Sequence, residues 1–299
     1  SSFFLPRRNT GVRPLLKLGV NSVGYYVANY FSSNMDKTLI GKRFGAEELG
    51  YYSRAFYIST TPSGQFTQSL FHVAVSTLSK LRQDPEDYRR YYLRAISVIS
   101  FIGMPLSIFM VVMSKDLVYL LLGSQWNKTA EIFSILGLSA GMNIIYTTNG
   151  WLHVSLGRTD RWLKWGIFAS VIMVAGFFIG APFGSQGVAS AYTMITIFLT
   201  FPGILYAGKP IGLTLLMVIS SIWKYTCASV VAGGVFYFIQ KLAFDNSGII
   251  IRMVLSLLGY TLIYLLVVIV LYGSTKPIKE FAVLFRNMLQ KMLPYQKTG

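Results

Sequence analysis

The chain has 299 residues, with 27 Lys and Arg against 11 Asp and Glu, so its formal net charge is +16. Hydrophobic residues make up 53% of it and charged residues only 13%, about half the share of roughly 25% in soluble domains. This composition excludes a charge-rich nucleic-acid binder, and its 19 Tyr and 21 Phe exclude a disordered basic tail. We therefore interpret the chain as an integral membrane protein whose few charges are mostly positive.

Charge-free runs mark the predicted membrane spans in chain order. A span needs about 20 mostly apolar residues, and one run is long enough for two spans separated by the turn-forming stretch 180–187. The predicted span at 210–240 is interrupted only by Lys224, whose long side chain can reach the lipid headgroups. The spans lie in 18–35, 55–79, 95–114, 132–157, 165–208 (two spans), 210–240 and 253–275. The predicted fold class is therefore all-α, a polytopic membrane helix bundle of about eight transmembrane helices.

The loops between these spans differ in their Lys and Arg content. Loops on one side of the membrane carry 18 of these residues and those on the other side carry 8. Because cytoplasmic loops are enriched in Lys and Arg, the alternation predicts that both ends of the chain are cytoplasmic.

The early spans are polar and the late ones are not. Ser, Thr, Asn and Gln recur in 18–35 and 55–79, whereas Leu, Val, Ile and Tyr dominate 253–275. Polar groups that face lipid cost free energy, so we expect the early spans to surround a wet cavity and the late spans to face lipid. Pro62 and Pro105 are expected to kink their helices. The tail 275–294 has an apolar face at helical spacing and predicts either a lipid-binding amphipathic helix or a solvated tail helix.

Five stretches carry a more specific pattern. They are NMDKTLIG (34–41), GAEELGYYSRA (45–55), LSKLRQDPEDYRR (78–90), LLGSQW (121–126) and NGWLHVSLGRTD (149–160). Together they resemble the Wzx-type polysaccharide exporters, in particular the branch with the colanic-acid exporter. Lipid II flippases and multidrug-and-toxin extrusion transporters belong to the same superfamily.

The resemblance implies a domain organisation. Such proteins have two six-helix lobes, and this chain begins with Ser at what looks like the linker before the second lobe. We therefore expect a fragment of a longer protein, its C-terminal half. The expected parts are a cytoplasmic linker (1–17), a six-helix lobe (18–206), two additional transmembrane helices (207–273) and a cytoplasmic amphipathic tail (274–299).

The resemblance also implies a function. The location that it implies is the bacterial inner membrane. The expected substrate is an undecaprenyl-diphosphate-linked oligosaccharide, an O-antigen or exopolysaccharide repeat unit, moved across this membrane by alternating access. The lipid-linked oligosaccharide, the bilayer, a polysaccharide polymerase and other export components are the expected partners, and nucleic acid is not. No phosphate-binding glycine loop or catalytic constellation is present in the sequence, so no cofactor and no enzyme activity are expected. With one Cys and two His, we expect no clustered metal site.

Two charged residues are the leading site candidates. Arg54, which we expect to open the second span after a turn at 51–53, has a guanidinium suited to bidentate phosphate binding. Its alternative is a loop arginine paired with Glu47 or Glu48. Asp36 lies near the end of the first span, where a carboxylate is a candidate for coupling transport to an ion gradient. Its alternative is a helix-end carboxylate at the membrane interface.

The remaining candidates are polar or aromatic residues for sugar. They are Asn29, Asn34, Tyr25, Tyr26 and Asn143. For each of these, and for Tyr30, Asn149 and His153, helix packing or a hydrogen bond between helices is the alternative.

Two other functions stay open on the sequence. A drug or cation antiporter of the same superfamily needs acidic coupling residues, and only Asp36 is available within the spans. A membrane polysaccharide polymerase or ligase needs a large periplasmic loop with clustered Arg, His or Glu, and the predicted outer segments are short.

Overall fold

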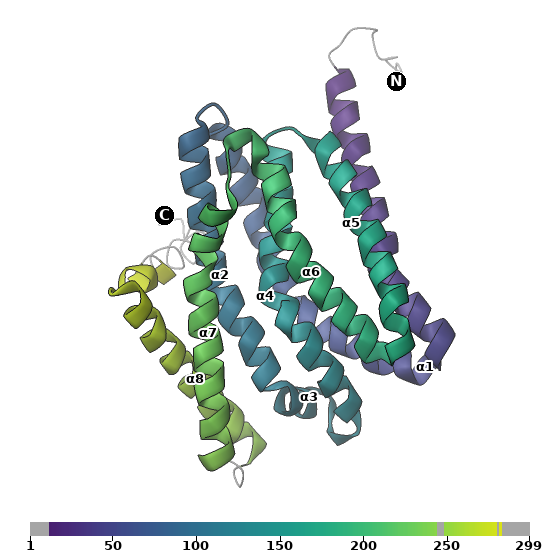
Figure 1. Cartoon of the computed structure of the whole chain (residues 1–299), viewed down its shortest axis with the longest axis vertical. Helices are drawn as coiled ribbons and strands as arrows, with labels where there is room; N and C mark the ends of the chain where they lie inside the picture. Colours follow the sequence, from purple (N-terminus) through teal and green to yellow (C-terminus); the bar gives the residue numbers. More distant parts are fainter. Residues whose placement is uncertain (1–11, 244–247, 280, 283–299) are drawn as a thin grey trace, which may run out of the picture.

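The computed structural model describes residues 12–243, 248–279 and 281–282, and within them the chain is a bundle of α-helices without strands (Figure 1). Short 3-10 turns at Ser124–Trp126, Ala181–Phe183 and Lys209–Ile211 join some of the helices. The helices are α1 (Val12–Lys80), α2 (Pro85–Val112), α3 (Ser114–Leu122), α4 (Asn127–Ser155), α5 (Thr159–Gly180), α6 (Gly184–Gly208), α7 (Leu215–Ala243) and α8 (Ile249–Tyr272). The predicted fold class is confirmed.

Helix α1 consists of two arms that meet at Gly45. Its φ of 88° and ψ of 179° break the helix there, and this backbone region is essentially restricted to glycine. The first arm (12–44) and the second arm (46–80) contain the first two predicted spans. The expected turn at 51–53 is wrong, because these residues are helical and Arg54 lies inside the second arm.

Other helix ends follow local chemistry. The Asp84 side chain accepts hydrogen bonds from the backbone N–H groups of Glu86 and Asp87, and Pro85 occupies the first turn, so α2 begins there. The predicted turn in 180–187 is confirmed as the connection between α5 and α6, with Gly184 at a φ of 76°.

The helices pack around α4, which contacts α1, α2 and α6. The first arm lies along α5, and the second arm lies along α4. A Cβ at Gly141 would come within 2.6 Å of the Gly103 carbonyl oxygen, so only small residues allow α2 and α4 to approach this closely. The loops 81–84, 156–158 and 209–214 gather at one end, the predicted inner end (top in Figure 1).

Five helical stretches of the described chain are long and apolar enough to cross a membrane. They are Pro85–Val112, Ser124–Ser155, Thr159–Ile211, Leu215–Lys241 and Ile249–Tyr272, the third of which contains both α5 and α6. The two arms of α1 are not among them. Each predicted span lies mostly in helix, although 210–214 precedes α7 and 273–275 follows α8. The number of crossings and the division into a lobe and two added helices stay predictions.

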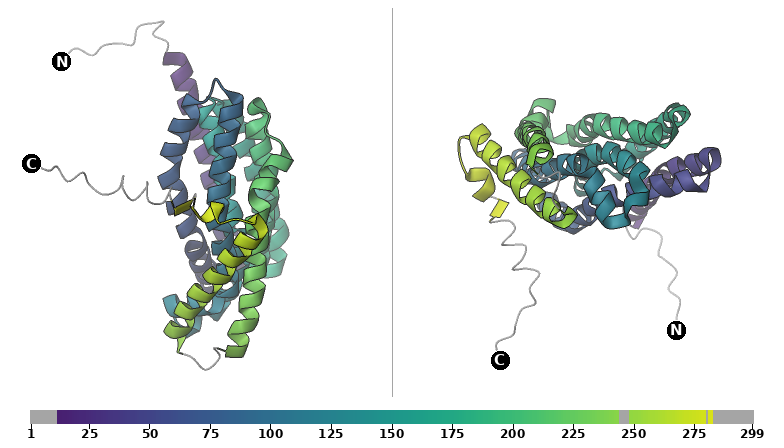
Figure 2. Two further views of the ribbon diagram at one scale, coloured as in Figure 1. Left: turned by 90° about the vertical axis from the view of Figure 1, so that its left-hand side faces the viewer. Right: turned by 90° about the horizontal axis from the view of Figure 1, so that it is seen from below.

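Helix α7 packs against α2, and α8 packs against α7. Figure 2 shows α8 inclined to the other helices of the bundle. At the predicted outer end, Arg252 of α8 and Gln240 of α7 both donate hydrogen bonds to the carboxylate of Asp116 on α3. Beyond α8, Ile278 and Phe281 of the predicted amphipathic tail pack against the core. The rest of that tail, from 283 on, lies outside the described residues.

Candidate functional site

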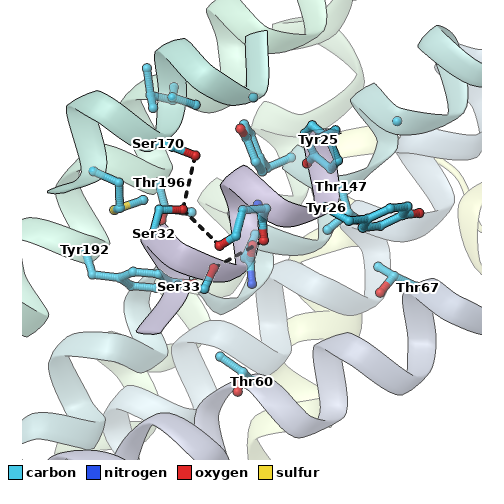
Figure 3. Close-up of a pocket in the computed structure, with 18 of the residues that line it drawn as sticks. Tyr25, Tyr26, Ser32, Ser33, Thr60, Thr67, Thr147, Ser170, Tyr192 and Thr196 are labelled. Carbon is cyan, nitrogen blue, oxygen red and sulfur yellow. Dashed lines mark hydrogen bonds between the residues drawn. The ribbon is translucent and has the colours of Figure 1, made fainter. Parts of the chain in front are cut away.

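A cavity of about 710 Å³ lies between the two arms of α1. Helices α4, α5 and α6 complete its walls, so five helical segments that are far apart in the sequence surround it (Figure 3). Because its walls combine hydroxyl, amide and aromatic side chains, we treat this cavity as the candidate site.

The first arm supplies one polar wall. In an α-helix, residues three and four positions apart share a face, and the lining residues of this arm recur at that spacing. They are Tyr25, Tyr26, Asn29, Ser32, Ser33 and Asp36. The predicted polar face of the first span therefore does face a cavity.

Hydroxyl contacts fasten this wall to α5. Ser170 donates to the carbonyl oxygen of Ala28 at 3.3 Å, and its hydroxyl lies 3.2 Å from that of Ser32. Ser32 in turn donates to the carbonyl oxygen of Asn29 at 3.0 Å. A single polar side chain of the apolar helix α5, Ser170, thus contacts the first arm at two points.

Asp36 is the one Asp, Glu, Lys or Arg among the described residues that line the cavity. It is only 1% exposed. Its Oδ2 accepts a hydrogen bond from the Tyr52 hydroxyl at 2.8 Å, and its Oδ1 accepts one from the backbone N–H of Lys37 at 2.7 Å. Asp36 is not at the end of its helix, because the first arm continues for eight residues beyond it, to Phe44.

Three aromatic rings form a shelf on the cavity wall near the predicted inner end. The ring of Tyr25 stacks on Trp162 with centroids 4.1 Å apart, and Tyr26 meets Trp162 edge-on at 5.6 Å. A Cβ at Gly166 would lie 2.4 Å from the Tyr25 ring, so glycine is needed there. We call Tyr25, Tyr26 and Trp162 the aromatic shelf.

The structure brings five of the seven predicted site residues to this cavity. They are Asp36, Asn29, Tyr25, Tyr26 and Asn143. Asn34 is not among the lining residues, and its side chain donates to the carbonyl oxygen of Tyr30 at 2.8 Å. Arg54 is also outside the lining set and is exposed, while Glu47 and Glu48 have other partners, Tyr51 and Lys128.

Comparison with known proteins identifies what the chain is similar to. Residues 5–131 match a family model described as "Polysaccharide biosynthesis protein". The lipopolysaccharide biosynthesis protein WzxC of Escherichia coli is 23% identical over 71% of this chain and 44% of its own length. The teichuronic acid biosynthesis protein TuaB of Bacillus subtilis is 24% identical over 89% of this chain and 56% of its own length. The predicted resemblance is confirmed.

The fold has a solved counterpart as well. A structure titled lipid II flippase MurJ, inward closed conformation, superposes with a TM-score of 0.68 at 19% identity, over 83% of this chain and 52% of that one. At this identity the match shows the fold, a polytopic helix bundle. The chain spans about half the length of these relatives.

The sequence did not indicate the walls that α5 and α6 provide. Ser170, Tyr192 and Thr196 line the cavity, yet each stands within an otherwise apolar run and marks no face by itself. Within the described residues, no group of three His, Cys, Asp or Glu side chains could hold a metal ion.

Proposed function

We propose that the chain forms one lobe of a transporter that moves a lipid-linked oligosaccharide across the bacterial inner membrane by alternating access. The observation that carries the proposal is the cavity of about 710 Å³ with polar and aromatic walls inside a bundle of apolar helices. Sugars present hydroxyl groups to amides and hydroxyls, and their apolar faces stack on aromatic rings. The similarity to polysaccharide biosynthesis proteins supports the same substrate class.

The lipid-bound diphosphate needs a separate place in this proposal. No Lys or Arg is among the described lining residues, so the cavity itself offers phosphate no cation. Arg54 is exposed on the second arm and takes part in none of the ion pairs found among the described residues. Two residues along a helix rotate a side chain by about 200°, so Arg54 points away from the cavity that Phe56 lines. We assign the phosphate contact to that outer face of the second arm.

The outer face of the first arm suggests where the transporter continues. Val20, Val23, Val27 and Phe31 follow one another at helical spacing and are 50–68% exposed. In a protein of the relatives' length, further helices would cover this apolar stripe. Movement of those helices against this lobe is the alternating-access step of the proposal.

Asp36 gives the proposal a coupling group. A lone carboxylate in a cavity without Lys or Arg is suited to holding a proton or a metal cation. An acidic group in the cavity is also what the second candidate function, a drug or cation antiporter, requires, although such an antiporter needs more than this one. The two functions differ in the molecule that the cavity carries, which is a sugar headgroup in the flippase and a drug in the antiporter.

Complementation of a bacterial strain that lacks its polysaccharide flippase tests the proposal. The full-length protein should restore surface polysaccharide, and Tyr26→Ala on the aromatic shelf should reduce it several-fold at equal membrane insertion. Tyr30→Ala is the matched control, because Tyr30 is 67% exposed on the same arm but does not line the cavity. Resistance to cationic drugs without any restored polysaccharide would establish the antiporter instead.

A further inference from the structure

Lys224 interrupts the predicted span at 210–240, and the proposed transport step does not use it. It lies nine residues after Leu215, where α7 begins, so it stands about 14 Å along that helix. Its side chain is half-buried. An ionisable side chain within a membrane span costs free energy, and such residues usually have a partner or a function.

The ammonium group of Lys224 lies over aromatic rings. Its Nζ is 4.3 Å from the ring centroid of Tyr272, at the end of α8, and 5.9 Å from that of Trp223. Within the described part of the chain, Lys224 takes part in no ion pair and its ammonium makes no hydrogen bond. A ring face attracts a cation but does not neutralise its charge, so an anionic partner can still bind.

The helices around Lys224 offer it no carboxylate. Helices α7 and α8 contain no Asp or Glu, and the acids of α2, Glu86 and Asp87, lie in its first turn. Tyr225, the neighbour of Lys224, meets the middle of α2, where its hydroxyl lies 3.1 Å from that of Ser97. Ser97 is ten residues beyond Asp87, about 15 Å along the helix. These three helices therefore leave the positive charge uncompensated.

The inner end of α8 indicates the level of Lys224 relative to the bilayer. Helix α8 has 24 residues and is about 36 Å long, so even an inclined α8 can span a hydrocarbon core of about 30 Å. It ends at Tyr272, and Gly273 follows with a φ of 62°. In Figure 1 this end of α8 lies below the inner end of α7. Because Tyr272 contacts the ammonium group, we expect Lys224 to lie at the level of the inner headgroups.

The segment after α8 brings further positive charge to this level. The ring of Phe281 packs against that of Phe101 on α2, with centroids 5.1 Å apart, so the segment turns back onto the bundle. Phe101 also lies 5.8 Å from Tyr225 of α7. Lys276 and Lys279 belong to this segment and are exposed. Two further lysines thus lie near the junction of α7 and α8.

We propose that Lys224, Lys276 and Lys279 bind the phosphate of an anionic phospholipid of the inner leaflet at the junction of α7 and α8. The ring of Tyr272 positions the Lys224 ammonium, and the headgroup supplies the negative charge that the surrounding helices lack. Each cation near a membrane surface strengthens binding to anionic lipid about fivefold. None of these lysines lines the large cavity, so the site does not depend on the transported substrate.

Native mass spectrometry of the full-length protein, titrated with phosphatidylglycerol in detergent, tests the site. Lys224→Met should weaken binding of the first phosphatidylglycerol about fivefold, whereas Lys224→Arg, which keeps the charge, should bind like the parent protein. Lys209→Met is the matched control, because Lys209 is an exposed lysine at the same predicted inner end and its loss should change binding less than about twofold. Unchanged binding by Lys224→Met, or equal weakening by Lys209→Met, would overturn the proposal.

Competing ligands distinguish the phospholipid from other sources of phosphate. Phosphatidylcholine, whose headgroup has no net charge, should not displace phosphatidylglycerol from the parent protein. Displacement by inorganic phosphate would identify a site for free phosphate. Preferential displacement by undecaprenyl diphosphate would assign the site to the transported lipid. Either of these two results would overturn the phospholipid as the occupant.

A double-mutant cycle tests whether an acid of the chain neutralises Lys224 instead. Glu280 follows Lys279 in the sequence and lies outside the described residues. Glu280→Gln should change phosphatidylglycerol binding equally in the parent protein and in Lys224→Met, because the two side chains are not expected to interact. An effect of Glu280→Gln that disappears in Lys224→Met would show that Glu280 is the partner of Lys224 and would contradict the proposal.

Discussion

The Tyr52 hydroxyl donates a hydrogen bond to Oδ2 of Asp36 at 2.8 Å, and this contact joins the two arms of α1 across the break at Gly45. Both side chains are at most 1% exposed. The carboxylate in the cavity is therefore held by the opposite arm. A change in the angle between the arms changes the hydrogen bonding of Asp36, which links the state of the cavity to the shape of the lobe.

Tyr52→Phe should destabilise the protein by about 1–3 kcal/mol, because a buried carboxylate loses one of its hydrogen-bond donors. The ring itself, which stacks near Phe56 at 6.0 Å, is retained. Thermal unfolding in nanodiscs measures the effect. Tyr51→Phe is the control, since its hydroxyl donates to Glu47 at the surface and its loss should cost less than about 0.5 kcal/mol. Equal losses for the two variants would show that the contact between the arms contributes nothing.

Asp36→Asn should reduce polysaccharide export and remove its dependence on the ion gradient. The amide oxygen can still accept from Tyr52, so the arms stay joined, but the side chain can no longer carry a charge. Export is measured in cells at graded protonophore concentrations. Glu47→Gln changes an exposed acid at the predicted outer end and should behave like the parent protein. Normal export by Asp36→Asn with unchanged gradient dependence would rule out the coupling role.

The helices were predictable because a membrane span requires a characteristic length and composition, and the charge-free runs meet that requirement. The interruption in α1 was not placed correctly, because the charged stretch around Gly45 has the composition of a loop although the helix continues on both sides of it. Only the φ of 88° at Gly45 identifies the break, and no residue pattern encodes that angle uniquely. The tyrosines at 51 and 52 were mistaken for a turn and are helical.

The cavity was predictable on one wall only. Asn29 and Asp36 fall on one helical face of the first arm, so its polarity could be read from spacing. Ser170 and Thr196 could not be assigned, because the inward face of an apolar helix depends on which neighbours pack against it. The position of Arg54 could not be predicted for the same reason. Its neighbour Ala55 is buried, but successive residues of a helix point in directions about 100° apart, and the Arg54 side chain is exposed.

Arg252→Leu should loosen α8 at the predicted outer end. Arg252 makes two hydrogen bonds to Asp116, whose side chain is only 12% exposed, and the change leaves Gln240 as the remaining side-chain donor. We expect a loss of about 1–3 kcal/mol and faster amide hydrogen exchange in α8 than in α4. Arg43→Leu, at an exposed position near Gly45, is the control for losing a positive charge. Uniform exchange changes across all helices would contradict a local role.

The double variant Asp116→Leu with Arg252→Leu measures the interaction free energy between the two side chains, when its stability is compared with those of the two single variants. Removing both partners avoids a buried unpaired carboxylate, so the double variant should be more stable than the sum of the two single losses predicts. Additive losses would show that the two side chains act independently.

Low pH should weaken the contact that Glu48 of the second arm makes with Lys128 of α4 and Ser185 of α6. Burial opposes ionisation of Glu48, but hydrogen bonds from Lys128 and Ser185 outweigh it and lower the pKa of this carboxyl below its usual 4.5. A lowered pKa in the folded state contributes stability above the unfolded pKa, and this stability is lost as the pH falls through the folded value. Tm should therefore decline below pH 4.5 more steeply in the parent protein than in Glu48→Gln. Parallel Tm curves for the two proteins would contradict the assignment.

Gly45→Ala should be the most damaging of the glycine changes in α1. A residue with a side chain rarely adopts the φ of 88° found there, and holding one in that region costs about 1–3 kcal/mol. We expect lower thermal stability and, because the angle between the arms shifts, lower export at equal membrane insertion.

Gly50→Ala is the matched control five residues further along the second arm. Gly50 is helical, and a Cβ there meets nothing within 4 Å, so the change should be neutral or stabilise the helix by up to about 1 kcal/mol. The space around Gly45 is equally open, so a difference between the two variants isolates backbone conformation from steric fit. Equal stability of the two variants would mean that the break in α1 tolerates any residue and does not depend on glycine.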